Sequence, residues 1–90
     1  MQKIRFDYYR NIGGFIVEHH ATKYMGDTFL VYVDVSYKNK RIFTADCYAD
    51  KSFFAEMLDI KTSECTPEII KDRFSEIENQ IDWEFNFPNK

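Results

Sequence analysis

Apolar and polar residues alternate most regularly over residues 28–37. The odd positions of this segment hold the apolar side chains Phe29, Val31, Val33, Val35 and Tyr37. Because successive side chains of a strand point to opposite faces, this period of two predicts a strand with one buried face. Less regular alternation predicts two neighbouring strands, at residues 15–24 and 41–48.

The register between the strands at 28–37 and 41–48 can be argued from the side chains. A three-residue loop at 38–40 would match the strands through the pairs Tyr37–Arg41, Val35–Phe43, Val33–Ala45 and Val31–Cys47. A two-residue loop would instead place apolar residues opposite polar ones. Since a slip of one residue moves every side chain to the other face, we expect the three-residue loop.

The two ends of the chain alternate over shorter stretches. Near the start, the alternating apolar residues are Ile4, Phe6 and Tyr8. They predict a first strand, joined to the next by a turn at residues 11–14. Near the end, the alternating residues are Trp83, Phe85 and Phe87. They are typical of a final edge strand or of an extended clamp across the core, and we favour the strand.

Two segments carry the helical period. From Asp50 onward, a short helix is predicted by the apolar stripe Phe53, Phe54, Met57 and Leu58. Thr66-Pro67 is typical of a helix start, because Thr accepts backbone N–H bonds and Pro fits the first helical position. Behind it, a long helix is predicted by Ile70, Phe74, Ile77 and Ile81, spaced i, i+4, i+7 and i+11.

These elements predict a single α+β domain over residues 1–90, strand-rich over 1–48 and helix-rich over 49–90. We expect a mainly antiparallel sheet of four or five strands, with two helices packed on one face. Short loops between consecutive strands favour a β-meander. The composition agrees with a globular domain, since 44% of the residues are hydrophobic and 30% are charged.

The expected location is the cytoplasm. The first residues lack the apolar run of a signal peptide, and no stretch has the length of a membrane span. Two cysteines, Cys47 and Cys65, are therefore expected to be reduced thiols. A catalytic role for Cys65, which precedes a helix start, has no His or Lys partner in the sequence to support it.

The sequence contains no strong catalytic or cofactor motif. His19 and His20 are adjacent, so on a strand they point to opposite faces and cannot bind one metal together. A metal site would need His20 with Asp34 and Asp46, and no spacing motif supports it. An acid–base pair among Asp34, Asp46 and Glu18 would lack a nucleophile and a walled pocket. We expect no metal, no cofactor and no enzymatic activity.

Two surfaces are candidates for binding. The first is the open face of the sheet, with the tyrosines Tyr9, Tyr24, Tyr32 and Tyr48. The second is the exposed side of the long helix, with the acids Glu68, Asp72, Glu76 and Glu78. Charge separates the two halves of the chain. Residues 1–48 hold seven Lys and Arg against five Asp and Glu, and residues 49–90 hold five against ten.

The functional hypothesis is a small non-catalytic interaction domain that docks on the basic surface of a protein partner. We favour the acidic helix as its contact, because complementary charge speeds association. Phage and mobile-element inhibitors of nucleic-acid-handling enzymes have this general character, and the chain could act as such an inhibitor or regulator. One alternative is a single-stranded nucleic-acid-binding module that uses the tyrosines, and another is a small enzyme of unknown type. The oligomeric state stays open, a homodimer included.

Overall fold

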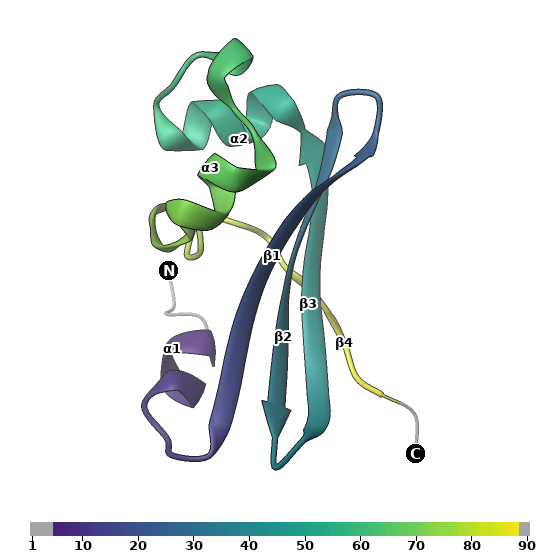
Figure 1. The fold of residues 1–90 in the computed structure, drawn as a ribbon, viewed down its shortest axis with the longest axis vertical. Coiled ribbons are helices and arrows are strands. Elements are labelled where there is room, and N and C mark those ends of the chain that lie inside the picture. Colours follow the sequence, from purple (N-terminus) through teal and green to yellow (C-terminus); the bar gives the residue numbers. More distant parts are fainter. Residues whose placement is uncertain (1–4, 89–90) are drawn as a thin grey trace.

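The computed structural model describes residues 5–88 of the chain. In order, its elements are α1 (Arg5–Arg10), β1 (Phe15–Met25), β2 (Thr28–Tyr37), β3 (Lys40–Asp50), α2 (Lys51–Leu58), the 3-10 turn η1 (Thr62–Glu64), α3 (Pro67–Asp72), the 3-10 turn η2 (Phe74–Glu76) and β4 (Glu84–Asn86) (Figure 1). The strands form one antiparallel sheet in the order β1-β2-β3-β4. The predicted α+β fold with a meander sheet is confirmed.

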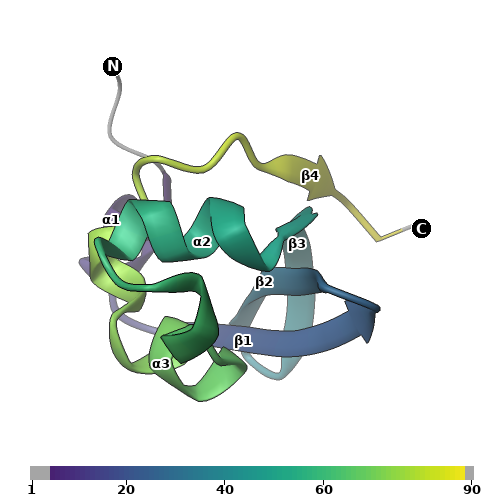
Figure 2. The ribbon, with the colours of Figure 1, turned by 90° about the horizontal axis from the view of Figure 1, so that it is seen from above.

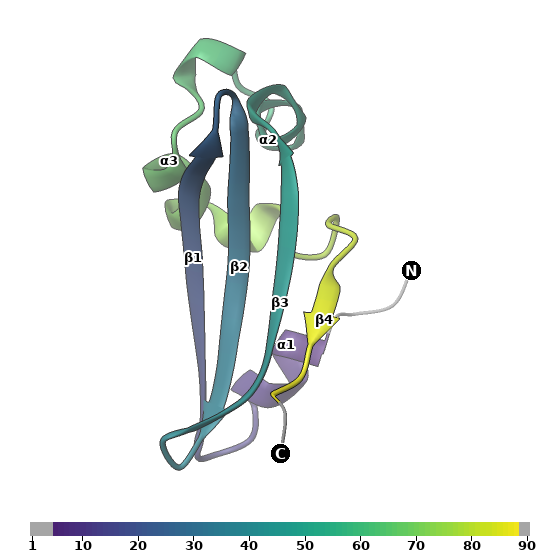
Figure 3. The same cartoon turned by 90° about the vertical axis from the view of Figure 1, so that its right-hand side faces the viewer.

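The helices lie on one side of the sheet. Figures 1 and 2 show α1, α2 and α3 on the same side of the long strands, and in Figure 3 they lie behind the sheet. The odd-numbered residues of β2 point toward them, and Val31, Val33 and Val35 are fully buried. The even-numbered residues point away, so the period of two in the sequence separates a covered face from an open face.

The predicted three-residue loop of the β2–β3 hairpin is wrong, although three of the four predicted pairs form. Val35 lies opposite Phe43 and Val33 opposite Ala45, as expected, but Tyr37 lies opposite Lys40 and not Arg41. The turn has two residues with positive φ, 52° at Lys38 and 69° at Asn39. Such a turn matches the twist of the strands. A β-bulge beyond it adds one residue to β3 and restores the apolar register.

The predicted first strand is wrong within the described residues, because residues 5–10 form helix α1. Ile4 lies outside the described part of the chain. Phe6 is fully buried, whereas Tyr8 is 64% exposed. The next buried contact comes from Tyr9, three residues after Phe6, which is a helical spacing. Over so short a segment, the sequence pattern does not distinguish the period of a strand from that of a helix. The helical conformation instead follows from the packing of Phe6 and Tyr9 against the core.

The predicted long helix is interrupted. α3 begins at Pro67 as expected, with Thr66 Oγ1 accepting a bond from the Ile69 N–H at 3.2 Å, but it ends at Asp72. The apolar stripe is buried all the same, with Phe74 in the 3-10 turn and Ile77 after it. Arg73 breaks the helix with φ −112° and ψ 30° while its guanidinium donates to the Leu58 carbonyl at 3.0 Å.

The end of the chain forms the predicted edge strand. Phe85 of β4 lies opposite Ala45 of β3 and packs against the core. Trp83 precedes the strand and is 8% exposed.

Both cysteines are free. Burial raises the thiol pKa of both Cys47 and Cys65, which disfavours the nucleophilic thiolate.

Candidate functional site

One face of the sheet, here called the open face, is covered by none of the described helices (Figure 3). Strand alternation points its side chains away from the core. At its centre lies a shallow depression of about 330 Å³, lined by Thr22, Leu30, Tyr32, Asp34, Arg41, Thr44 and Asp46. Three adjacent strands therefore supply one continuous surface of polar, charged and aromatic side chains.

Tyrosines mark one end of this face. Tyr24 and Tyr48 are 55% and 52% exposed, and their rings meet edge to face at 4.9 Å. Farther along, the His20 ring stacks on Tyr32 at 4.6 Å with an interplanar angle of 15°. Rings held in place by each other lose little conformational entropy on binding, which makes them suitable contact residues.

The tyrosine prediction is wrong at one position. Tyr9 belongs to α1, on the covered side of the sheet, where its ring packs on Phe15 at 4.9 Å and on Phe43 at 5.5 Å. The error follows from the misassigned first strand, since a strand would have placed Tyr9 on the open face. Tyr24, Tyr32 and Tyr48 lie on that face as predicted.

Carboxylates face each other across the open face. Glu18 of β1 lies opposite Asp34 of β2, and Asp46 of β3 lies opposite Glu84 of β4. Desolvation and the nearby Glu84 charge raise the pKa of Asp46, although Asn86 donates a hydrogen bond to it at 3.1 Å. Like charges in directly opposed positions destabilise a sheet. These two pairs therefore bring four acidic side chains to one face of the sheet.

Arg41 offsets part of this charge. Its Nε lies 3.6 Å from Asp34 Oδ1, and its side chain is 62% exposed. A contact of this length at the surface contributes little to stability. Among residues 5–88, no Lys, Arg or His side chain lies within ion-pair distance of the carboxylates of Glu18, Asp46 and Glu84.

The acidic helix is smaller than the sequence predicted. Glu68 and Asp72 are exposed on α3. Glu76 lies beyond the end of the helix and accepts two hydrogen bonds from Arg73, at 2.7 and 2.9 Å, which lower the pKa of its carboxyl group. The placement of Glu78 on the exposed side is wrong, because this residue is 4% exposed.

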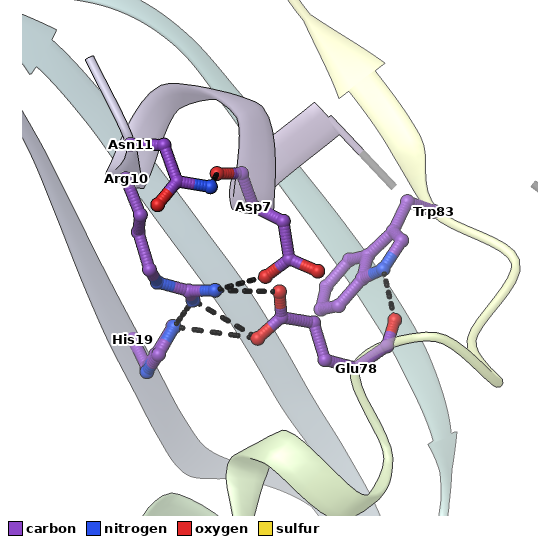
Figure 4. Close-up of polar contacts among 6 residues, drawn as sticks. All are labelled: Asp7, Arg10, Asn11, His19, Glu78 and Trp83. Atoms are coloured by element: carbon purple, nitrogen blue, oxygen red, sulfur yellow. Dashed lines mark hydrogen bonds and ion pairs between the residues drawn. The ribbon is translucent and has the colours of Figure 1, made fainter. Parts of the chain in front are cut away.

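Glu78 instead joins distant parts of the chain (Figure 4). Arg10 of α1 donates to both of its carboxylate oxygens at 2.9 Å, and Asp7 contacts the same guanidinium at 3.0 Å. The Glu78 carbonyl accepts a bond from Trp83 Nε1 at 3.0 Å. We call Asp7, Arg10, His19 and Glu78 the buried-carboxylate cluster. The bond to Glu78 raises the pKa of Arg10.

His19 completes this cluster on the covered side of β1. Arg10 donates to His19 Nε2, and the imidazole stacks on Phe74 at 4.0 Å with an interplanar angle of 7°. Burial, followed by the Arg10 charge, lowers the pKa of His19 and favours its neutral form. The cluster was missed from the sequence, yet a signal existed. Glu78 lies four residues after Phe74, within the apolar stripe.

The comparisons with known proteins leave the function to be argued from the site. No family model matches the sequence, and no curated protein or solved structure is significantly similar to it. None of the described helices is both long and apolar enough to cross a bilayer.

Proposed function

We propose that this chain is a non-catalytic interaction domain that binds a protein partner rich in Lys and Arg through the open face of its sheet. The supporting observation is that carboxylates with no cationic partner among residues 5–88 lie on the same face as exposed tyrosines, and no described helix covers this face. The acidic residues of α3 are a weaker candidate, because Glu78 is buried and Glu76 is paired with Arg73.

The chemistry of this face matches a basic protein surface. Its acids would attract such a partner at long range, and complementary charge mainly raises the association rate. Its tyrosines would then supply buried contact area, and their negatively polarised ring faces also attract Lys and Arg. A partner that handles nucleic acid has a basic surface of this kind. Occluding that surface would make the chain an inhibitor or regulator.

Single-stranded nucleic acid is a poorer match. The rings of Tyr24 and Tyr48 could stack on bases. The phosphate backbone, however, needs a concentrated basic surface, and the open face instead carries Glu18, Asp46 and Glu84.

The proposal can be tested with two variants of equal charge change. Glu18→Lys with Glu84→Lys reverses two acids at the two edges of the open face, and Glu68→Lys with Asp72→Lys reverses two acids on α3. The partner is captured from a lysate of the native host with the wild-type chain and identified by mass spectrometry. Association and dissociation rates are then measured with the purified partner at low and moderate salt.

The open-face variant should associate at least about tenfold more slowly than wild type at low salt, and the α3 variant should change much less. Tyr24→Ala with Tyr48→Ala should increase the dissociation rate. The opposite ranking of the two charge variants would move the contact to α3. Salt-sensitive binding of a single-stranded oligonucleotide, lost in the tyrosine variant, would favour the nucleic-acid-binding alternative.

A further inference from the structure

Three metal-ligand side chains converge on the open face, at the centre of the β1–β2 hairpin. Glu18 and His20 are two residues apart in β1, and Asp34 lies directly opposite Glu18 in β2. One ligand atom from each residue lies within 4.8 Å of those of the other two. The three come from two paired strands, so the sheet backbone holds their relative positions.

One ring nitrogen of His20 lacks a hydrogen bond within residues 5–88. Its Nε2 is shielded from solvent and makes no hydrogen bond to any described residue. It lies 3.5 Å from Asp34 Oδ2. Stacking on Tyr32 at 4.6 Å limits rotation of the imidazole. A buried polar atom without a hydrogen bond is costly, and a metal ion between Nε2 and the carboxylate would satisfy it.

We propose that Glu18, His20 and Asp34 bind a divalent transition-metal ion of the Mn²⁺ or Zn²⁺ class. One imidazole with two carboxylates is a donor set that both ions accept. For Zn²⁺, bonds of about 2.0–2.2 Å at a tetrahedral angle place neighbouring ligand atoms roughly 3.3–3.6 Å apart. The 3.5 Å between His20 Nε2 and Asp34 Oδ2 already has this value. Glu18 is exposed and can rotate to complete the set.

Two charged residues, Arg41 and Asp46, lie near the proposed ligands without belonging to the set. Asp34 uses Oδ1 toward Arg41, at 3.6 Å, and presents Oδ2 to His20. Arg41 thereby orients the carboxylate as an outer-shell group, while its positive charge weakens the site. The sequence had suggested Asp46 as a third ligand. Glu18 takes that place, and Asp46 is not in the group whose ligand atoms converge.

Binding of the metal alone is the direct test. Mn²⁺ is the better first probe, because it prefers oxygen and nitrogen ligands and avoids the thiols of Cys47 and Cys65. Mn²⁺ is titrated into the full chain by calorimetry, and paramagnetic broadening of NMR signals is mapped on the same protein. We expect saturable binding of one ion per chain, with broadening centred on His20 and the side chains of Glu18 and Asp34.

Substitutions then separate coordination from general charge attraction. His20→Asn and Asp34→Asn should each weaken binding at least about tenfold. Asp46→Asn is the matched control, since it removes the same charge from the same face outside the ligand set, and its affinity should stay near the wild-type value. The wild-type broadening map needs no variant, so a variant that fails to fold does not spoil the test.

Three results would overturn the site. They are the absence of saturable Mn²⁺ and Zn²⁺ binding, broadening centred away from His20, and an affinity loss in Asp46→Asn as large as that in Asp34→Asn. The test uses no protein partner, so its outcome is independent of the proposed interaction with a basic surface.

Discussion

His19 and His20 are neighbours in β1, but the two faces of the strand give them different surroundings. His19 lies on the covered face, where Arg10 donates to it and Phe74 stacks on it. His20 lies on the open face, where Tyr32 stacks on it and its Nε2 has no hydrogen bond to a described residue.

The carboxylates on the two sides of the sheet also differ in how they are paired. Glu78 on the covered face receives two bonds from Arg10. On the open face, Glu18 and Asp34 oppose each other, as do Asp46 and Glu84. A buried charge must be paired because desolvation is expensive, whereas water tolerates an unpaired charge at the surface. Polar groups therefore serve the fold on one face and remain available for a ligand on the other.

The largest expected difference concerns the rings that stack on the two histidines. Phe74→Ala should lower the free energy of unfolding by about 3–5 kcal/mol, because it leaves a cavity beside His19 and Trp83. Tyr32→Ala on the open face should cost about 1 kcal/mol or less. Denaturant melts of both variants measure this, and equal losses would contradict the assignment of the two faces.

The second comparison is between the arginines of the two faces. Arg10→Gln removes the arginine from the buried Glu78 carboxylate and leaves it the 3.7 Å contact with His19, whose neutral form is favoured. We expect a loss of about 2–3 kcal/mol, less than for a fully buried pair because Arg10 is itself a third exposed. Arg41→Gln should change stability by about 0.5 kcal/mol or less, since its contact with Asp34 is at the surface. A melt in which Arg41→Gln is the more damaging change would reverse our view of the two sites.

The reactivity of the two thiols measures how well they are shielded on the covered side of the sheet. Both should be free, so alkylation of the denatured chain without reductant should add two groups. In the native protein, alkylation should be at least about tenfold slower, because burial shields the sulfur and disfavours the thiolate. Cys47 is half-buried and should react before the fully buried Cys65. A mass two units low with no adduct would reveal a disulfide.

The smallest expected effect is a gain. Glu84→Lys replaces the like-charge pair with Asp46 by an opposite-charge pair, which should stabilise the protein by about 0.2–1 kcal/mol at low salt. The same change should slow association with a basic partner, as proposed above. The difference from wild type should shrink as salt is added. Destabilisation by this change would mean that Asp46 and Glu84 do not repel each other as their positions indicate.

The sequence by itself determined the central sheet and its two faces. Val31, Val33 and Val35 follow a period of two in β2, so all three lie on one face of the strand. Burying the opposite face instead would expose all three to water. The same parity placed Tyr24, Tyr32 and Tyr48 on the open face. The start of α3 could also be predicted from neighbouring residues alone. Thr66 accepts a backbone N–H bond at the helix N-terminus, and Pro67 fits the first helical position.

Tertiary structure alone decided the features that depend on distant partners. Residues 5–10 are too few for their period to be read, so packing of Phe6 and Tyr9 made them helical. Glu78 is polar and looked exposed, but Arg10, 68 residues away, neutralises it in the interior. The grouping of Glu18 and His20 with Asp34 likewise needed the β1–β2 register. Local periodicity reports which side of an element is buried, whereas the partner of a buried charge is set by the fold.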